Sequence, residues 1–157
     1  MPPLRRLATD ACSLILLQRV DLLKNVARYE LLITPQVWRE VKAGSNDASL
    51  FAAAVKIMPS SVPLAADDGV IQLYLDGAAE AVLSDDGRVL RFCRAQGIPH
   101  YCCLSLLSLL VRDRCLAPAA AAEGLARLRA VGRYSAQVFA HASQMLADAL
   151  AGSTARE

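Results

Sequence analysis

Acidic residues recur in this 157-residue chain where a short apolar segment gives way to a segment typical of a helix. Asp10, for example, follows the apolar residues 7–9 and precedes an apolar stretch that begins at Ala11. If the apolar segments are neighbouring parallel strands, their carboxyl ends share one edge, and ligands bind at such edges in α/β proteins. Carboxylates gathered in one cleft repel each other, and a divalent cation relieves the repulsion. The acids in question are Asp10, Glu40, Asp67, Asp68, Asp85 and Asp86.

Helix capping is the simpler explanation for most of these acids. An aspartate before a helix accepts hydrogen bonds from free backbone amides, and the helix dipole holds it ionised. Glu40, however, falls in the middle of its expected helix and cannot cap it, and Asp85-Asp86 places two like charges where one cap suffices. A capping carboxylate also keeps a second oxygen for a metal. Taken together, the acids favour a metal site.

Composition limits the class of protein. Hydrophobic residues make up 55% of the chain and charged residues 20%, which excludes a disordered chain, and the length suits one domain. The net charge of +2 argues neither for nor against a nucleic-acid partner. Five cysteines without a Cys-x-x-Cys spacing argue against a disulfide framework and a zinc site, and Cys12, Cys93 and Cys103 are predicted to be core residues. No apolar stretch is long enough to span a bilayer, so we expect a cytoplasmic protein without a signal peptide.

Short candidate strands alternate with candidate helices along the chain. This alternation predicts right-handed βαβ units and a parallel sheet covered on both faces, hence a three-layer α/β/α sandwich with a helical C-terminal extension. We expect a single domain over residues 4–151 and a disordered tail over 152–157. The expected strands are 5–9, 31–33, 81–83 and 98–101, and the expected helices are 11–18, 20–27, 36–42, 47–56, 67–75, 87–95, 104–114, 119–131 and 136–151.

Three segments, in this order and spacing, resemble the PIN domain family. They are Thr9–Ile15, Ile33–Val41 and Val82–Arg88, and Arg94–Pro99 is similar to the family's passage from a helix into its last strand. The resemblance covers about residues 5–112, and a helical part at about 118–151 suits a subgroup of the family. PIN domains are metal-dependent ribonucleases that include the VapC-type toxins of bacterial toxin–antitoxin pairs.

The resemblance assigns roles to the acids. Asp10 matches the first acid of the family and Glu40 the second, while the third is either Asp67 or Asp68 because two registers fit. The fourth acid follows a Ser or Thr by two residues, which selects Asp86 after Ser84. Asp85 and the hydroxyls of Ser13 and Ser84 then support the metal ligands. Oxygen ligands suit Mg²⁺ or Mn²⁺.

The implied activity is that of a divalent-metal-dependent endoribonuclease that hydrolyses RNA phosphodiester bonds, and a toxin of this kind has an antitoxin protein as its partner. A non-catalytic PIN-like module that binds RNA or protein stays open as the alternative. A Rossmann-like phosphatase or nucleotide-binding protein is disfavoured, because the chain has no Gly-rich phosphate loop.

RNA must approach an acidic cleft, so cations are needed beside it. Arg39, Arg88 and Arg91 are the candidates for RNA contacts, although each could equally belong to a solvated helix face. The apolar residues of 104–111 and 136–150 could form a homodimer interface or pack in the core, and no membrane partner is expected.

Overall fold

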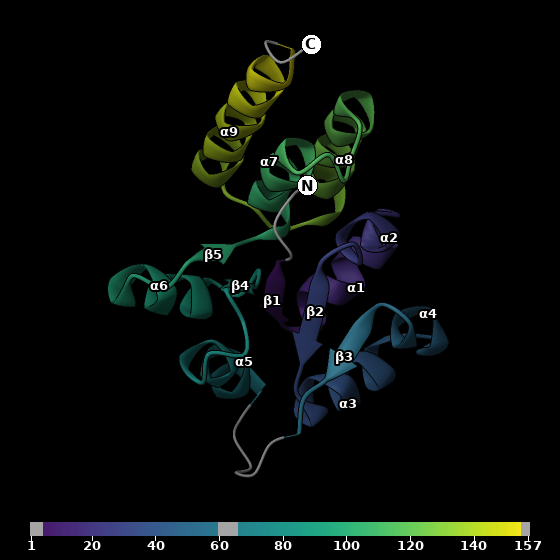
Figure 1. Cartoon of the computed structure of the whole chain (residues 1–157). Coiled ribbons are helices and arrows are strands. Elements are labelled where there is room, and N and C mark those ends of the chain that lie inside the picture. The colour runs from purple at the N-terminus through teal and green to yellow at the C-terminus, as the bar shows by residue number, and fades with distance from the viewer. Residues whose placement is uncertain (1–4, 60–65, 155–157) are drawn as a thin grey trace.

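The protein contains one five-stranded parallel β-sheet and a set of α-helices (Figure 1). The computed structural model describes residues 5–59 and 66–154, apart from the side chains of Ala66, Asp67, Ser153 and Thr154. The strand order is β3-β2-β1-β4-β5, and every neighbouring pair is parallel. The strands are β1 (Arg6–Thr9), β2 (Glu30–Ile33), β3 (Val55–Ile57), β4 (Ala81–Leu83) and β5 (His100–Tyr101).

Strand β1 is the centre of the sheet and pairs with both β2 and β4. The chain runs outward from β1 to β2 and β3, and then returns to place β4 on the other side of β1. The strand order therefore reverses between β1 and β4, which creates the crevice where open α/β sheets bind ligands. Thr9 pairs with Leu83, so the residues that follow these two strands emerge side by side.

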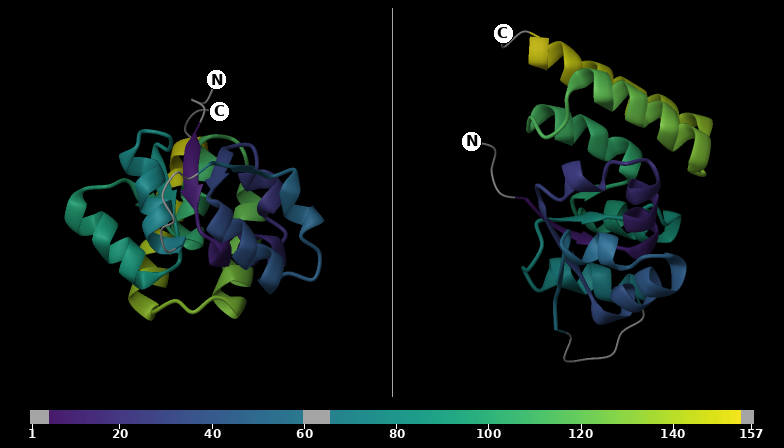
Figure 2. Two further views of the ribbon diagram at one scale, coloured as in Figure 1. Left: turned by 90° about the horizontal axis from the view of Figure 1, so that it is seen from below. Right: turned by 90° about the vertical axis from the view of Figure 1, so that its right-hand side faces the viewer.

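The helices connect the strands and then form a separate C-terminal group. Helix α1 packs against α3, and α5 packs against β1 and β4. Figures 1 and 2 show α7, α8 and α9 together on one side of the strands, an arrangement compatible with the expected three-layer sandwich and helical extension. No helix in the described residues is both long and apolar enough to cross a membrane. The helices are α1 (Ala11–Arg19), α2 (Leu23–Val26), α3 (Pro35–Gly44), α4 (Ser49–Ala52), α5 (Ala66–Leu75), α6 (Gly87–Gln96), α7 (Cys103–Arg112), α8 (Pro118–Val131) and α9 (Ala136–Thr154).

Local sequence signals explain where several helices begin and end. The side chains of Asp10, Thr34 and Asp86 accept hydrogen bonds from the first-turn amides of α1, α3 and α6. Pro35 occupies the first turn of α3, where it costs no helical hydrogen bond. Helix α6 ends at Gly97, whose φ of 69° lies in the left-handed region that glycine adopts without strain. These three helices begin and end within two residues of the expected helices 11–18, 36–42 and 87–95.

Helix α7 lies in the interior of the protein. All residues from Leu106 to Val111 are buried, and the helix packs against β5, α1, α8 and α9. A helix that is apolar around its whole circumference has to be covered on every side. Of the two alternatives for residues 104–111, a homodimer interface or core packing, the structure shows core packing.

The largest difference from the sequence prediction lies in residues 47–56. A single helix was expected there, but the structure contains the short helix α4, which is followed by strand β3. The alanines at 52–54 favour a helix locally, whereas Val55 and Ile57 extend and pair with Leu31 and Ile33 of β2. Pairing with the sheet outweighs the local propensity, a common result for short segments.

Smaller differences affect the ends of elements and one side chain. Helix α2 covers only Leu23–Val26 of the expected helix 20–27, because Asp21 takes a positive φ of 61° that interrupts a continuous helix. Helix α9 continues through Thr154 into the tail expected to be disordered, whose last residues, 155–157, lie outside the described residues. Cys93 and Cys103 are buried as expected, but Cys12 is exposed, so its assignment to the core was wrong.

A buried hydrogen bond joins the start of β2 to the end of α7. The hydroxyl of Tyr29 donates to Asp113 Oδ2 over 2.8 Å, and Arg5 Nε lies 3.4 Å from the same oxygen. Asp113 is 9% exposed, so water satisfies little of its carboxylate. Desolvation and the neighbouring Asp113 charge raise the pKa of Tyr29, which keeps its hydroxyl protonated as a donor.

We predict that Tyr29→Phe lowers the free energy of unfolding by about 1–3 kcal/mol, because it leaves a buried carboxylate without its best donor. Urea denaturation monitored by circular dichroism measures the change. Tyr74→Phe is the matched control on the half-buried α5 tyrosine and is expected to cost less than about 0.5 kcal/mol. Equal losses in the two variants would contradict the role given to the Tyr29–Asp113 bond.

Candidate functional site

Asp10 is a buried carboxylate at the end of the central strand. It is 7% exposed and lies between β1 and α1. Its Oδ1 accepts a 2.8 Å hydrogen bond from the Ser13 amide, and its Oδ2 accepts a short 2.5 Å hydrogen bond from the Ser84 hydroxyl. The first bond caps α1, and the second joins the end of β1 to the end of β4. Both oxygens are therefore held in fixed directions at the point where the strand order reverses.

Burial makes the charged form of Asp10 costly. Its pKa is raised from 3.8 to about 6, mainly by desolvation, and the nearby Asp85 charge adds to the shift. The hydrogen bonds from Ser84 and Ser13 act in the opposite direction but do not cancel the desolvation. Among the described residues, no lysine or arginine forms an ion pair with Asp10. At neutral pH this carboxylate carries a negative charge with little water or positive charge to stabilise it.

Asp85 occupies the same edge but is saturated with donors. Its Oδ1 accepts from the Cys103 amide at 3.1 Å and from the Tyr134 hydroxyl at 2.9 Å. Its Oδ2 accepts from the Ser13 hydroxyl at 2.8 Å, and the Cys103 thiol lies 2.9 Å away. Burial, followed by the Asp85 charge, raises the pKa of Cys103, so the thiol stays protonated and donates. These bonds make Asp85 a residue that fixes the site.

Asp86 combines a helix cap with a link to Ser84. Its Oδ1 accepts from the amides of Arg88 at 2.7 Å and Val89 at 3.4 Å, which caps α6. Its own amide donates to the Ser84 hydroxyl over 3.1 Å, the same hydroxyl that donates to Asp10. Ser84 therefore connects the two acids. Within residues 5–59 and 66–154, Asp86 Oδ2 accepts no hydrogen bond.

Glu40, on helix α3, acts on the same neighbouring thiol as the other three acids. The pKa of the Cys12 thiol is raised first by desolvation and then by the charges of Asp10, Glu40, Asp85 and Asp86. The Cys12 thiol, at the start of α1, therefore lies within electrostatic range of all four carboxylates, including that of Glu40 on α3. Glu40 itself is exposed and lies in the interior of α3, so it does not cap that helix.

The third predicted acid belongs to the start of α5. Gly69 lies against Thr34, because a Cβ placed at position 69 would be 3.0 Å from Thr34 Cγ2. Thr34 follows β2 and caps α3, so the first turn of α5 reaches the same edge of the sheet. Asp68 is exposed there, and the side chain of Asp67 lies outside the described residues. The choice between the two acids stays open.

The donor chemistry of this edge suits a hard cation, but the acids do not form a closed ligand set. In the part of the chain that the structure describes, no three His, Cys, Asp or Glu side chains lie close enough together to hold a metal ion. Asp10 is fixed, whereas Glu40 and Asp68 extend from helix surfaces and are exposed. A metal ion would therefore require the exposed acids to turn toward Asp10.

The predicted RNA-contacting arginines lie on two helices around this edge. Arg39 is exposed on α3, and Arg88 and Arg91 are exposed on α6. A Cβ built on Gly87 would be 3.2 Å from Arg91 Nη1, so the Arg91 guanidinium folds back along the first turn of α6, against the residue that follows Asp86. This position supplies a cation within one helical turn of an acid.

Tyr134 is a site residue that the sequence did not reveal. It lies in the loop between α8 and α9, and its hydroxyl reaches Asp85 across 49 positions of the chain. The tyrosine follows Gly132 and Arg133 in a segment without a recognisable motif, so only the folded arrangement of the C-terminal helices shows its partner.

Comparison with models of known protein families gives no match, and no curated protein matches the chain. The resemblance to PIN domains therefore stays a prediction based on three short segments.

We predict that Asp10→Asn changes how stability depends on pH. Because the folded state binds the Asp10 proton more tightly than the unfolded state, ionisation costs stability as pH rises from about 4 to about 6. Above that range the cost amounts to about 3 kcal/mol at most. The asparagine variant avoids this cost and should be more stable than the wild type at pH 8, with a smaller difference at pH 4.

Urea denaturation of both proteins at several pH values measures the difference. Asp148→Asn, which alters an exposed carboxylate on α9, is the control and should track the wild type throughout. A constant offset between Asp10→Asn and the wild type from pH 4 to pH 8 would contradict the raised pKa of Asp10.

Proposed function

We propose that this protein is a divalent-metal-dependent endoribonuclease that hydrolyses RNA phosphodiester bonds. The observation that carries the proposal is the buried Asp10 carboxylate, which lies where the strand order reverses and has further acids around it. A fixed, desolvated carboxylate among like charges gains free energy from a bound cation. The five-stranded parallel sheet and the resemblance of three segments to PIN domains support the same assignment.

Asp10, Glu40 and Asp86 would hold the Mg²⁺ or Mn²⁺ ion, together with Asp67 or Asp68. A bound divalent ion would supply a Lewis acid that stabilises negative charge on the reacting phosphodiester. Asp86 keeps Oδ2 for this purpose while Oδ1 caps α6. Glu40 is exposed, so it can change rotamer at little cost in packing.

The remaining residues orient these acids and bring RNA to them. Ser84 holds Asp10 and the Asp86 amide in one arrangement, and Asp85 anchors Ser13 and Tyr134 behind it. RNA phosphates are repelled by the acids, so Arg39 and Arg91 at the rim would offset that repulsion. Such contacts bind the backbone without selecting a sequence.

A toxin of a toxin–antitoxin pair is the more specific form of this proposal. It requires an antitoxin protein as partner, and the neighbouring gene tests it: a short adjacent reading frame that encodes a DNA-binding protein supports the toxin role.

We predict that the purified protein cleaves single-stranded RNA in the presence of Mg²⁺ or Mn²⁺ and that EDTA abolishes the cleavage. Asp10→Asn, Glu40→Gln and Asp86→Asn should each lower kcat/KM by about 100-fold or more, because each removes one ligand of the ion. Separate Asp67→Asn and Asp68→Asn variants decide which of the two residues is the third acid. Gel analysis of end-labelled RNA measures the rates.

Glu123→Gln and Asp148→Asn are the matched controls, since both alter exposed carboxylates on the C-terminal helices. Titration with Mn²⁺, followed by calorimetry, gives a readout independent of cleavage. The wild type should bind the ion, and Asp10→Asn should bind it at least about tenfold more weakly. Cleavage that survives in both Asp10→Asn and Glu40→Gln would reject the site. RNA binding without any cleavage would favour the non-catalytic module.

A further inference from the structure

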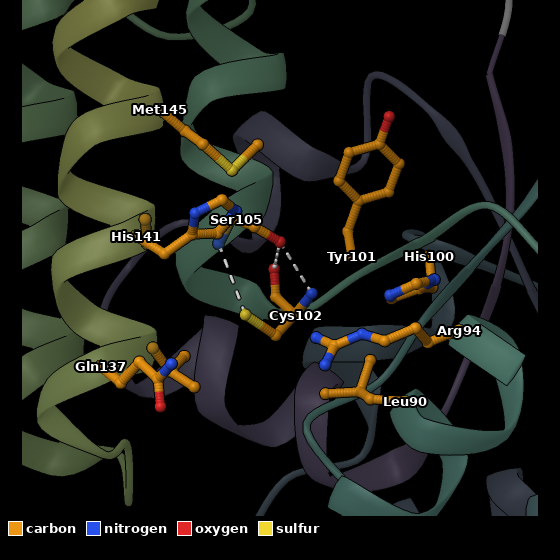
Figure 3. Close-up of a pocket in the computed structure, with 11 residues that line it drawn as sticks. Leu90, Arg94, His100, Tyr101, Cys102, Ser105, Gln137, His141 and Met145 are labelled. Atoms are coloured by element: carbon orange, nitrogen blue, oxygen red, sulfur yellow. Dashed lines mark hydrogen bonds between the residues drawn. The ribbon is translucent and has the colours of Figure 1, made fainter.

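A pocket lies between helix α6, strand β5 and helix α9. Its volume is about 620 Å³, within the roughly 300–1,000 Å³ range of small-molecule sites. Figure 3 shows Gln137 and His141 on the α9 side, and Leu90, Arg94 and His100 on the opposite side. The floor between them is formed by Cys102 and Ser105, which bond to each other at the start of α7.

The chemistry of this pocket is the opposite of that of the acidic edge. Among the described lining residues there is no Asp or Glu, whereas Arg94 contributes a permanent positive charge. His100 Nδ1 lies 2.8 Å from the Ile98 carbonyl oxygen, so this nitrogen donates and the other ring nitrogen stays available to a ligand. Leu90, Val138 and Met145 add apolar surface. A ligand that fits is partly flat and apolar and carries a negative group.

Helix α6 begins at the acidic edge and lines the pocket farther along its length. Asp86, Leu90 and Arg94 are spaced four residues apart, which places them on one face of the helix. Eight residues of helix span about 12 Å. An RNA strand that passes Asp86 could therefore also reach Arg94. The sheet also brings the pocket close to the acidic edge. The amide of Ser84, which follows β4, donates over 3.0 Å to the carbonyl oxygen of Tyr101 in β5, and Tyr101 lines the pocket.

We propose that this pocket binds one nucleotide, and that in the RNA substrate it is a nucleotide flanking the scissile phosphate. The second clause rests on the proposed nuclease function, whereas the first does not. Arg94 contacts the phosphate or stacks on the base, since its planar guanidinium serves for both. The Gln137 amide offers a donor and an acceptor to the base edge, and the apolar wall receives the face of the base.

Titration with the ribonucleoside 5′-monophosphates AMP, GMP, CMP and UMP tests the pocket without any catalysis. The full-length protein is kept in EDTA, and binding is followed by calorimetry and by ¹⁵N–¹H NMR shifts of residues 137–145. We expect binding of at least one monophosphate by the wild type. Arg94→Gln should weaken it by about tenfold or more, because a charged hydrogen-bond partner is lost.

Arg112→Gln is the matched control, because Arg112 is an exposed arginine at the far end of α7 and does not line the pocket. Absence of monophosphate binding by a folded wild type would overturn the proposal, as would equal affinities of Arg94→Gln and Arg112→Gln.

Cleavage assays on RNAs that differ at one position show whether the pocket binds a nucleotide of the RNA strand or a free nucleotide. A nucleotide of the strand gives the wild type a base preference at one position near the cut, and Gln137→Ala should reduce that preference. Arg94→Gln should raise KM and leave kcat unchanged, since it removes binding energy shared by substrate and transition state. Monophosphate binding without RNA cleavage would reject the nuclease proposal and assign the pocket to a free nucleotide, whereas cleavage without monophosphate binding would reject the pocket alone.

Discussion

The site depends on a carboxylate that the fold keeps away from water at the end of its central strand. Asp10 is buried because β1 has a neighbour on each side and α1 turns back directly after it. The register of β1 with β4 then brings Ser84 to the second oxygen of Asp10. The cost of this burial is visible in the raised pKa of Asp10. A native carboxylate placed at such a cost suggests that something else stabilises its charge during function.

The hydrogen bonds around Asp85 show how distant parts of the chain are held to this edge. One carboxylate receives donors from α1, from the start of α7 and from the loop before α9. A carboxylate with several donors is well satisfied and changes position at a large cost. The neighbouring Asp86, by contrast, keeps one oxygen without a donor in the described residues. Two adjacent aspartates thus differ sharply in their surroundings, although the sequence presents them as a simple pair.

Much of the fold follows from local sequence signals. The strand and helix at each of Asp10, Thr34 and Asp86 could be predicted because capping residues and apolar segments lie next to each other in the chain. Strand β3 could not be predicted in this way, because residues 55–57 become a strand through pairing with β2 and not through their own local preference. The same distinction applies to the site. Asp10, Ser13 and Ser84 could be named from the sequence, and the Ser13 amide and the Ser84 hydroxyl both donate to Asp10. Tyr134 and the pocket beside α9 depend on how the last helices pack.

Helix α7 has a consequence for how the chain can be divided. A boundary near residue 112 looks natural in the sequence, since the strands and acids precede it. Yet α7 carries apolar side chains on the face toward α8 and α9 as well as on the face toward the sheet. A fragment cut at that boundary would expose a row of leucines to water and remove one donor from Asp85. Helix α7 therefore shares its apolar surface between the sheet side and the last two helices, and a fragment without α8 and α9 would lose the cover of one of these faces.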